Sequence, residues 1–338
     1  MRTNQLLSAL ALLIAVAGCR TRGPVGDAVR GPLPTRLQHP LALTELAFRS
    51  RRPVAQSPGS TGAALQLSYS SIFTSNGDEQ GNFAFDGETA RATLRLRHGL
   101  GAGLDVEAEL PVSFSSGGFL DGFVQSFHAF LGLPDPRREH AVDNVHDMVL
   151  REGADDVWRQ EPDRIGLGDL PLFLAWSGGA SGSAASPAWR YGVRAGLELP
   201  TGSEQDGLGN GGVDWGAALS AERSQGRWTH HLAAWWARVA QPEGFEASSL
   251  ELADAWQAEY ALELRAFPSV SWIAQLQLRA PLVRGLDLEG LREPVLELAL
   301  GVVGDAAWGA RWFVSFHEDL ISRAGPDFAL ALGMTWNL

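Results

Sequence analysis

The sequence predicts an all-β protein, a transmembrane antiparallel outer-membrane β-barrel of about twelve strands with a helical outer loop between strands three and four. Two observations predict this fold. Apolar and polar residues alternate with a period of two in about a dozen segments between residues 62 and 338, and each segment is near the 9–11 residues with which a β-strand crosses a bilayer. On most segments the apolar side begins or ends in Trp, Tyr or Phe, as an interfacial aromatic girdle requires.

The segment 88–114 shows this alternation most clearly. Each half of it is aliphatic on one side, while the other side carries arginines in the first half and carboxylates in the second. We expect the aliphatic side to face lipid and the charged side to face the lumen, where opposite charges on neighbouring strands form a ladder of ion pairs. The predicted ladder consists of Arg91, Arg95, Arg97, Asp105, Glu107 and Glu109.

The same alternation places further charges in the lumen. The predicted inward acids are Asp105, Glu107, Glu109, Asp169, Glu198, Asp214, Glu222, Glu259, Glu263 and Glu297. The predicted inward arginines are Arg91, Arg95, Arg97, Arg190, Arg194, Arg265, Arg279 and Arg311. The two sets nearly balance, which favours a lumen cross-linked by its own charges, because a strongly selective pore more often carries an excess of one sign.

A soluble β-sandwich also alternates, but its second face would have to hold this charge in a dry core. Connection lengths also favour a barrel, since short periplasmic turns and long outer loops are typical of one, and an even strand number puts both ends of the barrel domain, 62–338, in the periplasm. Only the connection 177–188 departs from this alternation. The short connections are 99–103, 224–227, 267–269 and 304–306, and the long ones are 115–164, 200–212, 239–254, 283–293 and 319–326.

Composition excludes other classes of protein. The net charge is −12 and all 27 basic residues are arginine, so a nucleic-acid partner, which requires a basic surface, is not expected. The mature chain has no apolar run of about 18 residues, so we expect no transmembrane helix.

The N-terminus indicates export. Residues 1–18 have the basic start, apolar core and small-residue end of a secretory signal peptide, and "VAGC" at 16–19 resembles the bacterial lipobox, which implies that Cys19 carries a lipid. Cys19 is the one cysteine of the chain; the alternative is an ordinary cleavage site with an incidental cysteine. Proline-rich residues 19–61 predict an extended periplasmic segment, which either packs in the periplasmic mouth of the barrel or serves as a mobile linker.

The long connection 115–164 contains an apolar stripe at helical spacing. We predict a helix over 119–131 that folds into the outer mouth as a cap; the alternative is that it lies on the membrane surface. The predicted cap residues are Phe119, Phe123, Phe127 and Phe130. Downstream, the spacing of His140, Asp143, His146 and Asp147 would permit metal ligation, but a solvated loop explains these residues better, so we predict no metal site and no cofactor.

The blocks "LPTRLQHPLALTELAF", "GGFLDGFVQSFHAFLGLPDPRRE" and "GLGDLPL" resemble those of an uncharacterised bacterial outer-membrane family, catalogued as a domain of unknown function. "LELPTGSEQDGLGNGGVDWG" is similar to a block in outer-membrane barrels of aromatic-degradation pathways, which are presumed transporters. These resemblances imply an outer-membrane barrel, and neither family supplies catalytic residues to carry over, so they leave the activity open.

Three functions are compatible with this reading. We predict first a narrow or gated channel for small solutes. The second alternative is a structural or assembly lipoprotein that anchors periplasmic protein partners through residues 20–61. An enzyme acting on membrane lipid comes last, because the sequence has no His-x-Ser pair of the kind that an outer-membrane phospholipase uses. We therefore predict no enzyme, a location in the bacterial outer membrane, and outer-membrane lipid as the surrounding partner.

Overall fold

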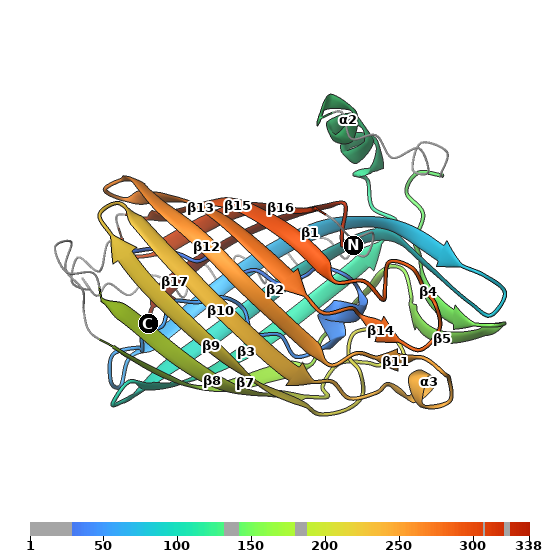
Figure 1. The fold of residues 1–338 in the computed structure, drawn as a ribbon, viewed down its shortest axis with the longest axis horizontal. Coiled ribbons are helices and arrows are strands. Elements are labelled where there is room, and N and C mark those ends of the chain that lie inside the picture. The colour runs from blue at the N-terminus through green and yellow to red at the C-terminus, as the bar shows by residue number, and fades with distance from the viewer. Residues whose placement is uncertain (1–28, 132–141, 180–187, 307, 321–324) are drawn as a thin grey trace, which may run out of the picture.

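The computed structural model describes residues 29–131, 142–179, 188–306, 308–320 and 325–338. Its main feature is one antiparallel sheet that closes into a barrel (Figure 1). The predicted signal peptide 1–18 and Cys19 lie outside the described residues, so both remain predictions.

Twelve strands form the barrel wall, which confirms the predicted fold. Each strand pairs antiparallel with its neighbour in sequence along the wall, and the last strand pairs with the first, so the barrel has no open edge. The wall strands are β1 (Thr61–Gly77), β2 (Gly81–Gly101), β3 (Leu104–Ser116), β7 (Leu170–Gly179), β8 (Trp189–Leu199), β9 (Asp214–Gln225), β10 (Trp228–Arg238), β12 (Ala255–Phe267), β13 (Val270–Arg279), β15 (Val295–Asp305), β16 (Arg311–Asp319) and β17 (Phe328–Asn337).

Alternation along the strands sorts side chains between the two faces of the wall. On β13, Gln275 and Gln277 are buried inside the barrel, while Trp272 is 58% exposed and Leu276 is 41% exposed on the outside. The outer face is therefore apolar and aromatic, as a surface that meets lipid must be, and closure satisfies the backbone hydrogen bonds that hydrocarbon cannot.

Smaller elements gather at one end of the barrel (Figure 1). A hairpin inside the predicted loop 115–164, which the periodicity did not predict, extends the edge of β2. None of the helices in the described part of the chain is long and apolar enough to cross a membrane. These elements are the 3-10 helix η2 (Leu41–Thr44), α2 (Asp121–Leu131), β4 (Asp147–Glu152), β5 (Asp155–Gln160), β6 (Arg164–Leu167), α3 (Glu243–Glu246), β11 (Glu251–Leu252) and β14 (Val283–Arg284).

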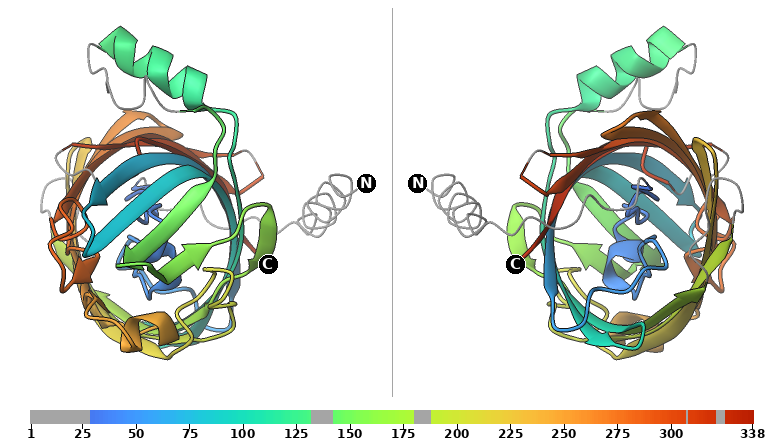
Figure 2. Two further views of the ribbon diagram at one scale, coloured as in Figure 1. Left: turned by 90° about the vertical axis from the view of Figure 1, so that its right-hand side faces the viewer. Right: turned by 90° about the vertical axis from the view of Figure 1, so that its left-hand side faces the viewer.

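The two ends of the barrel differ. We call the end with the tight connections after β2, β9 and β12 the turn end, and the end with α2, α3 and the β4–β5 hairpin the loop end (Figure 1). The helix expected at 119–131 is present as α2. Residues 29–60, which we call the plug, do not extend away from the barrel: Figure 2 shows this blue segment inside the ring of strands in the views from both ends.

Candidate functional site

The plug enters and leaves the lumen at the turn end. Arg30 lies beside the connections of that end, where its Nε is 2.8 Å from Asp305. The chain then rises to η2, and the ring of His39 packs edge-on against Phe85 with centroids 4.5 Å apart. It returns to the turn end, where the amide of Gly59 donates to the carbonyl of Gly99. The plug is therefore a hairpin-like excursion through the barrel.

Arginines of the returning arm bind buried carboxylates of the wall. Arg49 Nε lies 2.9 Å from Glu109, and both side chains are 2% exposed. Arg51 Nη1 lies 3.0 Å from both Asp105 and Glu107. Burial strengthens such charge-assisted contacts and makes either partner costly to leave alone.

Arg52 makes the most regular of these contacts. Its Nε and Nη2 each lie 2.7 Å from one oxygen of Glu222, so the guanidinium and the carboxylate meet as a two-pronged pair. One contact of opposite polarity exists deeper in the lumen, where Arg279 of β13 pairs with Glu45 of the plug. Apart from the pair of Glu45 with Arg279, the ion pairs described for the returning arm consist of plug cations on wall anions.

The wall also satisfies the plug backbone, which has no strand partner. The amides of Arg30 and Gly31 donate to the two oxygens of Glu263 at 2.9 and 3.0 Å, and Leu33 N donates to Gln275 at 3.1 Å. Leu46 N donates to Asp214 at 2.9 Å. Because buried amides need acceptors, polar side chains of the wall determine where a proline-rich segment can run.

Wall arginines meet the plug carbonyls in the same way. Arg194 donates to the carbonyl of Arg49 at 2.6 Å, and Arg91 donates to that of Leu43 at 3.1 Å. The wall therefore binds the amides, the carbonyls and the side chains of the plug.

Little space remains between plug and wall where Pro32 and Ser50 pass β10 and β12. The cavity bounded by Pro32, Ser50 and Arg51 of the plug and by His231 and Glu259 of the wall has a volume of about 10 Å³. That is about the room that one water molecule needs.

At the loop end, an apolar cluster surrounds the tip of the plug. The outer part of β2, the β4–β5 hairpin and the long loops all contribute to it, and β4 and β5 lie in front of the lumen in the left view of Figure 2. Each fully buried side chain of this kind stabilises the assembly by about 1.5–3 kcal/mol. The cluster includes Leu37, Leu41, Leu46, Phe48, Ile72, Phe83, Phe85, Met148, Leu150, Val157, Trp158, Phe173, Trp235, Phe245, Leu250, Leu252, Leu282, Leu288 and Leu291.

A contact between two loops helps to hold this cluster. Glu152, at the end of β4, accepts hydrogen bonds from the amide of Ser249, at 2.9 Å, and from its hydroxyl. These two bonds favour the ionised carboxylate and lower the pKa of Glu152. The hairpin is thus tied to the loop after β10.

The predicted ladder on β2 and β3 forms only in part. Arg97 binds Asp105 at 2.5 Å, and Arg95 lies opposite Glu109 in the strand register. However, Glu107 and Glu109 pair with plug arginines, and Arg91 and Arg97 also donate to plug carbonyls. The ladder residues face the lumen as expected, but the plug supplies most of their partners.

The helix α2 does not cap the lumen, because it lies outside the ring of strands (Figure 2). The ring centroid of Phe119 is 5.6 Å from that of Tyr69, and that of Phe123 is 5.4 Å from that of Phe328. Phe119 is still 72% exposed and Phe123 51%. The side chains of Phe127 and Phe130 lie outside the described part of the structure. The alternative reading, a helix on the membrane surface, agrees better with this position.

Glu88 explains the position of α2. By strand parity Glu88 lies on the outer face of β2, yet it is 1% exposed, because the amides of Phe119 and Leu120 and the hydroxyl of Tyr69 all donate to it. Gly118 has φ +73°, and a Cβ there would lie 1.9 Å from the Glu88 carboxyl carbon. The segment before α2 therefore docks on the outer wall through a buried carboxylate.

The loop residues considered for metal binding are divided among other contacts. Asp143 accepts from Gln125 at 3.2 Å, and His146 lies 3.2 Å from Ser115, while His140 lies outside the described residues. Within the described ranges, no group of three or more His, Cys, Asp or Glu side chains has an arrangement that would hold a metal ion.

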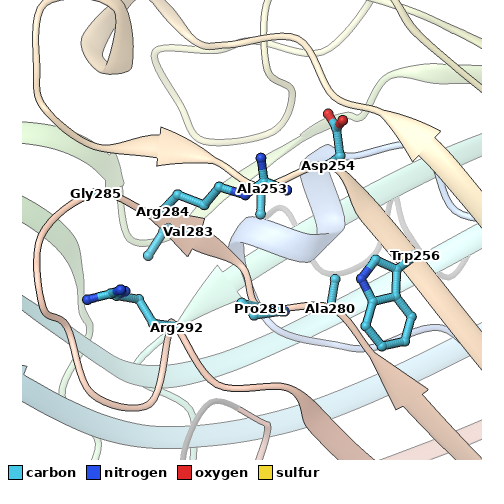
Figure 3. Close-up of a pocket in the computed structure, with 9 residues that line it drawn as sticks. All are labelled: Ala253, Asp254, Trp256, Ala280, Pro281, Val283, Arg284, Gly285 and Arg292. Carbon is cyan, nitrogen blue, oxygen red and sulfur yellow. The ribbon is translucent and has the colours of Figure 1, made fainter.

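A surface pocket of about 400 Å³ lies at the loop end beside β11 and β14 (Figure 3). Trp256 and Asp254 line one side, and Arg284 and Arg292 line the other. The ten luminal carboxylates predicted from the sequence take no part in this pocket. It is separate from the contacts that hold the plug.

Sequence reasoning missed two parts of the site. It gave no role to the arginines Arg49, Arg51 and Arg52, although the predicted luminal acids outnumber the predicted luminal arginines. It also treated 115–164 as one helical loop, although "NFAF" at 82–85 and "DMVL" at 147–150 are short apolar strands. The excess of luminal acids would have indicated a cationic segment inside the lumen. The two short apolar strands would have indicated a hairpin that covers the loop end of the barrel.

The fold and the filled lumen define a β-barrel of the outer-membrane type with an internal plug. The chain belongs to the family described as protein of unknown function (DUF3187), whose model matches residues 11–338. This confirms the resemblance to an uncharacterised outer-membrane family. No curated protein matches the sequence.

Solved structures share the architecture. The COG4313 outer membrane channel from Pseudomonas putida F1 superposes with a TM-score of 0.55 at 15% identity, covering 86% of this chain and 100% of that one. The KdgM porin gives a TM-score of 0.40 at 7% identity, with coverage of 82% and 99%. The beta domain of the Bordetella autotransporter BrkA gives 0.39 at 12% identity, with coverage of 83% and 100%. The first similarity supports the barrel fold.

Proposed function

We propose that the protein is a channel of the bacterial outer membrane for small solutes, and that its own plug holds it closed. The observation that carries this proposal is the path of residues 29–60, which fill a polar lumen without joining the wall ladder. A twelve-strand barrel is wider than the eight-strand kind that its own side chains fill. A separate segment is therefore needed to close this one.

The contacts of the plug are of a kind that water can replace. Ion pairs such as Arg51 with Asp105 and backbone bonds to Glu263 exchange for hydrated groups when the plug moves, whereas a strand of the wall could not leave without opening the ladder. The closed and open states then differ by a finite free energy, and any ligand that binds better to the open lumen shifts the population toward it.

We place the turn end in the periplasm, since short turns and both ends of the barrel domain lie there in outer-membrane barrels. Single cysteines in 239–254 and 283–293 should then react with an impermeant thiol reagent on intact cells, and cysteines in 224–227 and 267–269 should not. The reverse pattern of labelling would contradict this orientation.

Single-channel recording in planar bilayers tests the closure. A chain without residues 30–52 should show larger and longer openings than the full chain, provided that heat-modifiable migration on gels shows a folded barrel. A chain in which a Gly/Ser linker replaces 119–131 is the matched control, and it should conduct like the parent because α2 lies outside the lumen.

A structural role is the second candidate, and the tight filling of the lumen is the observation that favours it. In that case the barrel anchors periplasmic proteins, with Cys19 lipidated, and the plug is a permanent core. Equal and negligible conductance of the two folded variants would support this second function and refute the channel.

A further inference from the structure

Three wall sites hold the guanidinium groups of Arg49, Arg51 and Arg52 in the plug. Glu109 with Thr93 holds Arg49, the pair Asp105 and Glu107 holds Arg51, and Glu222 holds Arg52. The site residues belong to β2, β3 and β9, so they are part of the rigid wall and remain when the plug moves. The carboxylates among them are 7% exposed or less.

The geometry of these sites suits nitrogen cations of two shapes. Glu222 meets Nε and Nη2 of Arg52 with its two oxygens, each at 2.7 Å, and this two-pronged contact matches a guanidinium better than a point charge. Asp105 and Glu107 both approach the single Nη1 of Arg51 at 3.0 Å, an arrangement that an ammonium nitrogen can also occupy.

The charge of the lumen changes when the plug leaves. The plug carries five arginines and one glutamate, so its displacement removes mostly positive charge. The wall keeps ten buried carboxylates against eight predicted inward arginines, and of those arginines only Arg91, Arg194 and Arg279 are fully buried. Carboxylates that line a pore select cations in other channels. The wall alone therefore keeps a small excess of predicted inward carboxylates, which the arginines of the plug compensate in the closed state.

Resting on the proposed channel function, we propose that the sites of Arg49, Arg51 and Arg52 are the channel's binding sites for cationic solutes with guanidinium or ammonium groups, and that the plug closes the lumen by occupying them. Such a solute competes with the plug for Asp105, Glu107, Glu109 and Glu222. It therefore favours the open state and passes through a lumen that prefers cations.

The test uses the full chain with Arg49→Gln, Arg51→Gln and Arg52→Gln, which leaves the wall unchanged. In planar bilayers with a KCl gradient, the open channels of this variant should have a reversal potential that is shifted from zero toward the equilibrium potential of K⁺. Arginine amide at millimolar concentration should interrupt the current, and citrulline amide, which has a neutral isosteric side chain and keeps only the α-amino charge, should interrupt it much less. Adding Glu107→Gln and Glu222→Gln should reduce the cation preference and the block by arginine amide several-fold.

The outcomes separate the two proposals. Openings that are anion-selective or non-selective, and insensitive to arginine amide, would overturn the cationic-solute site while leaving the channel in place. A folded triple variant without any openings would overturn both. If the triple variant does not fold, Arg51→Gln alone keeps two of the three contacts. The reversal potential of its openings and their block by arginine amide then test the proposal in the same way.

Discussion

Replacing Arg49 with methionine should weaken the closed state more than most single substitutions. The guanidinium of Arg49 and the carboxylate of Glu109 are 2.9 Å apart, and both side chains are 2% exposed. Removing one partner of a buried pair costs about 3–5 kcal/mol, because the other charge remains desolvated. Arg95 lies opposite Glu109 in the strand register and offers a partial replacement, so we expect the lower end, about 3 kcal/mol.

This cost applies to the closed state only, since water reaches Glu109 once the plug has left. A difference of about 1.4 kcal/mol changes an equilibrium tenfold, so Arg49→Met should raise the ratio of open to closed channels about 100-fold. Open probability in planar bilayers measures this ratio. The double variant Arg49→Met with Glu109→Gln removes the unpaired charge and should return much of the closed population.

Arg159→Met is the matched control for the loss of an arginine. Arg159 pairs with Asp156 at the surface, where the two side chains are 42% and 36% exposed, and exposed pairs contribute about 0–1 kcal/mol. The open probability of the Arg159→Met variant should equal that of the parent protein. If Arg49→Met, with its barrel folded, opened no more often than Arg159→Met, the ion pair would not hold the plug and the reasoning would be refuted.

Three further predictions follow from other parts of the molecule. Leu300→Arg, on the lipid face of β15, should lower the free energy of folding into bilayers by about 2–4 kcal/mol, while Leu320→Arg, equally exposed but in a loop, should cost less than about 1 kcal/mol; similar losses would show that the faces are wrongly assigned. Glu88→Ala or Gly118→Ala should detach α2 and expose it to limited proteolysis in folded protein, and unchanged cleavage would contradict the docking. Mass spectrometry of the mature N-terminus should find diacylglycerol on Cys19; an unmodified chain beginning at Gly18 would refute lipidation.

The barrel wall was predictable because strand alternation is a local property. Side chains two residues apart share a face whatever the rest of the chain does, so the inward direction of Arg91 and Glu107 follows from sequence alone. The helix at 119–131 was predictable for the same reason, through its spacing. Its docking was not, since that depends on Glu88, a charge on the lipid side of β2 whose covering only the assembled structure shows.

The plug was not predictable by periodicity, because it has no regular structure between Arg30 and Pro40 and pairs with the wall through side chains. Its position depends on contacts that link residues more than 200 positions apart, such as Leu33 with Gln275 and Arg30 with Glu263. Gln275 also shows how the plug changes the surroundings of a wall residue. Strand alternation by itself gives Gln275 only an inward direction, but in the structure it is completely buried and holds the plug backbone.

A reversible crosslink between plug and wall tests the central claim most directly. The hydroxyl of Ser68 on β1 donates to the side chain of Gln38, near the plug tip, at 3.0 Å. The test joins Gln38→Cys and Ser68→Cys with a short bis-methanethiosulfonate, which forms a disulfide with each cysteine and releases methanesulfinate. In a chain that also carries Arg49→Met and Cys19→Ala, this crosslink should stop the openings, and reductant should restore them. Undiminished conductance of the fully crosslinked protein would show that the plug does not close this barrel.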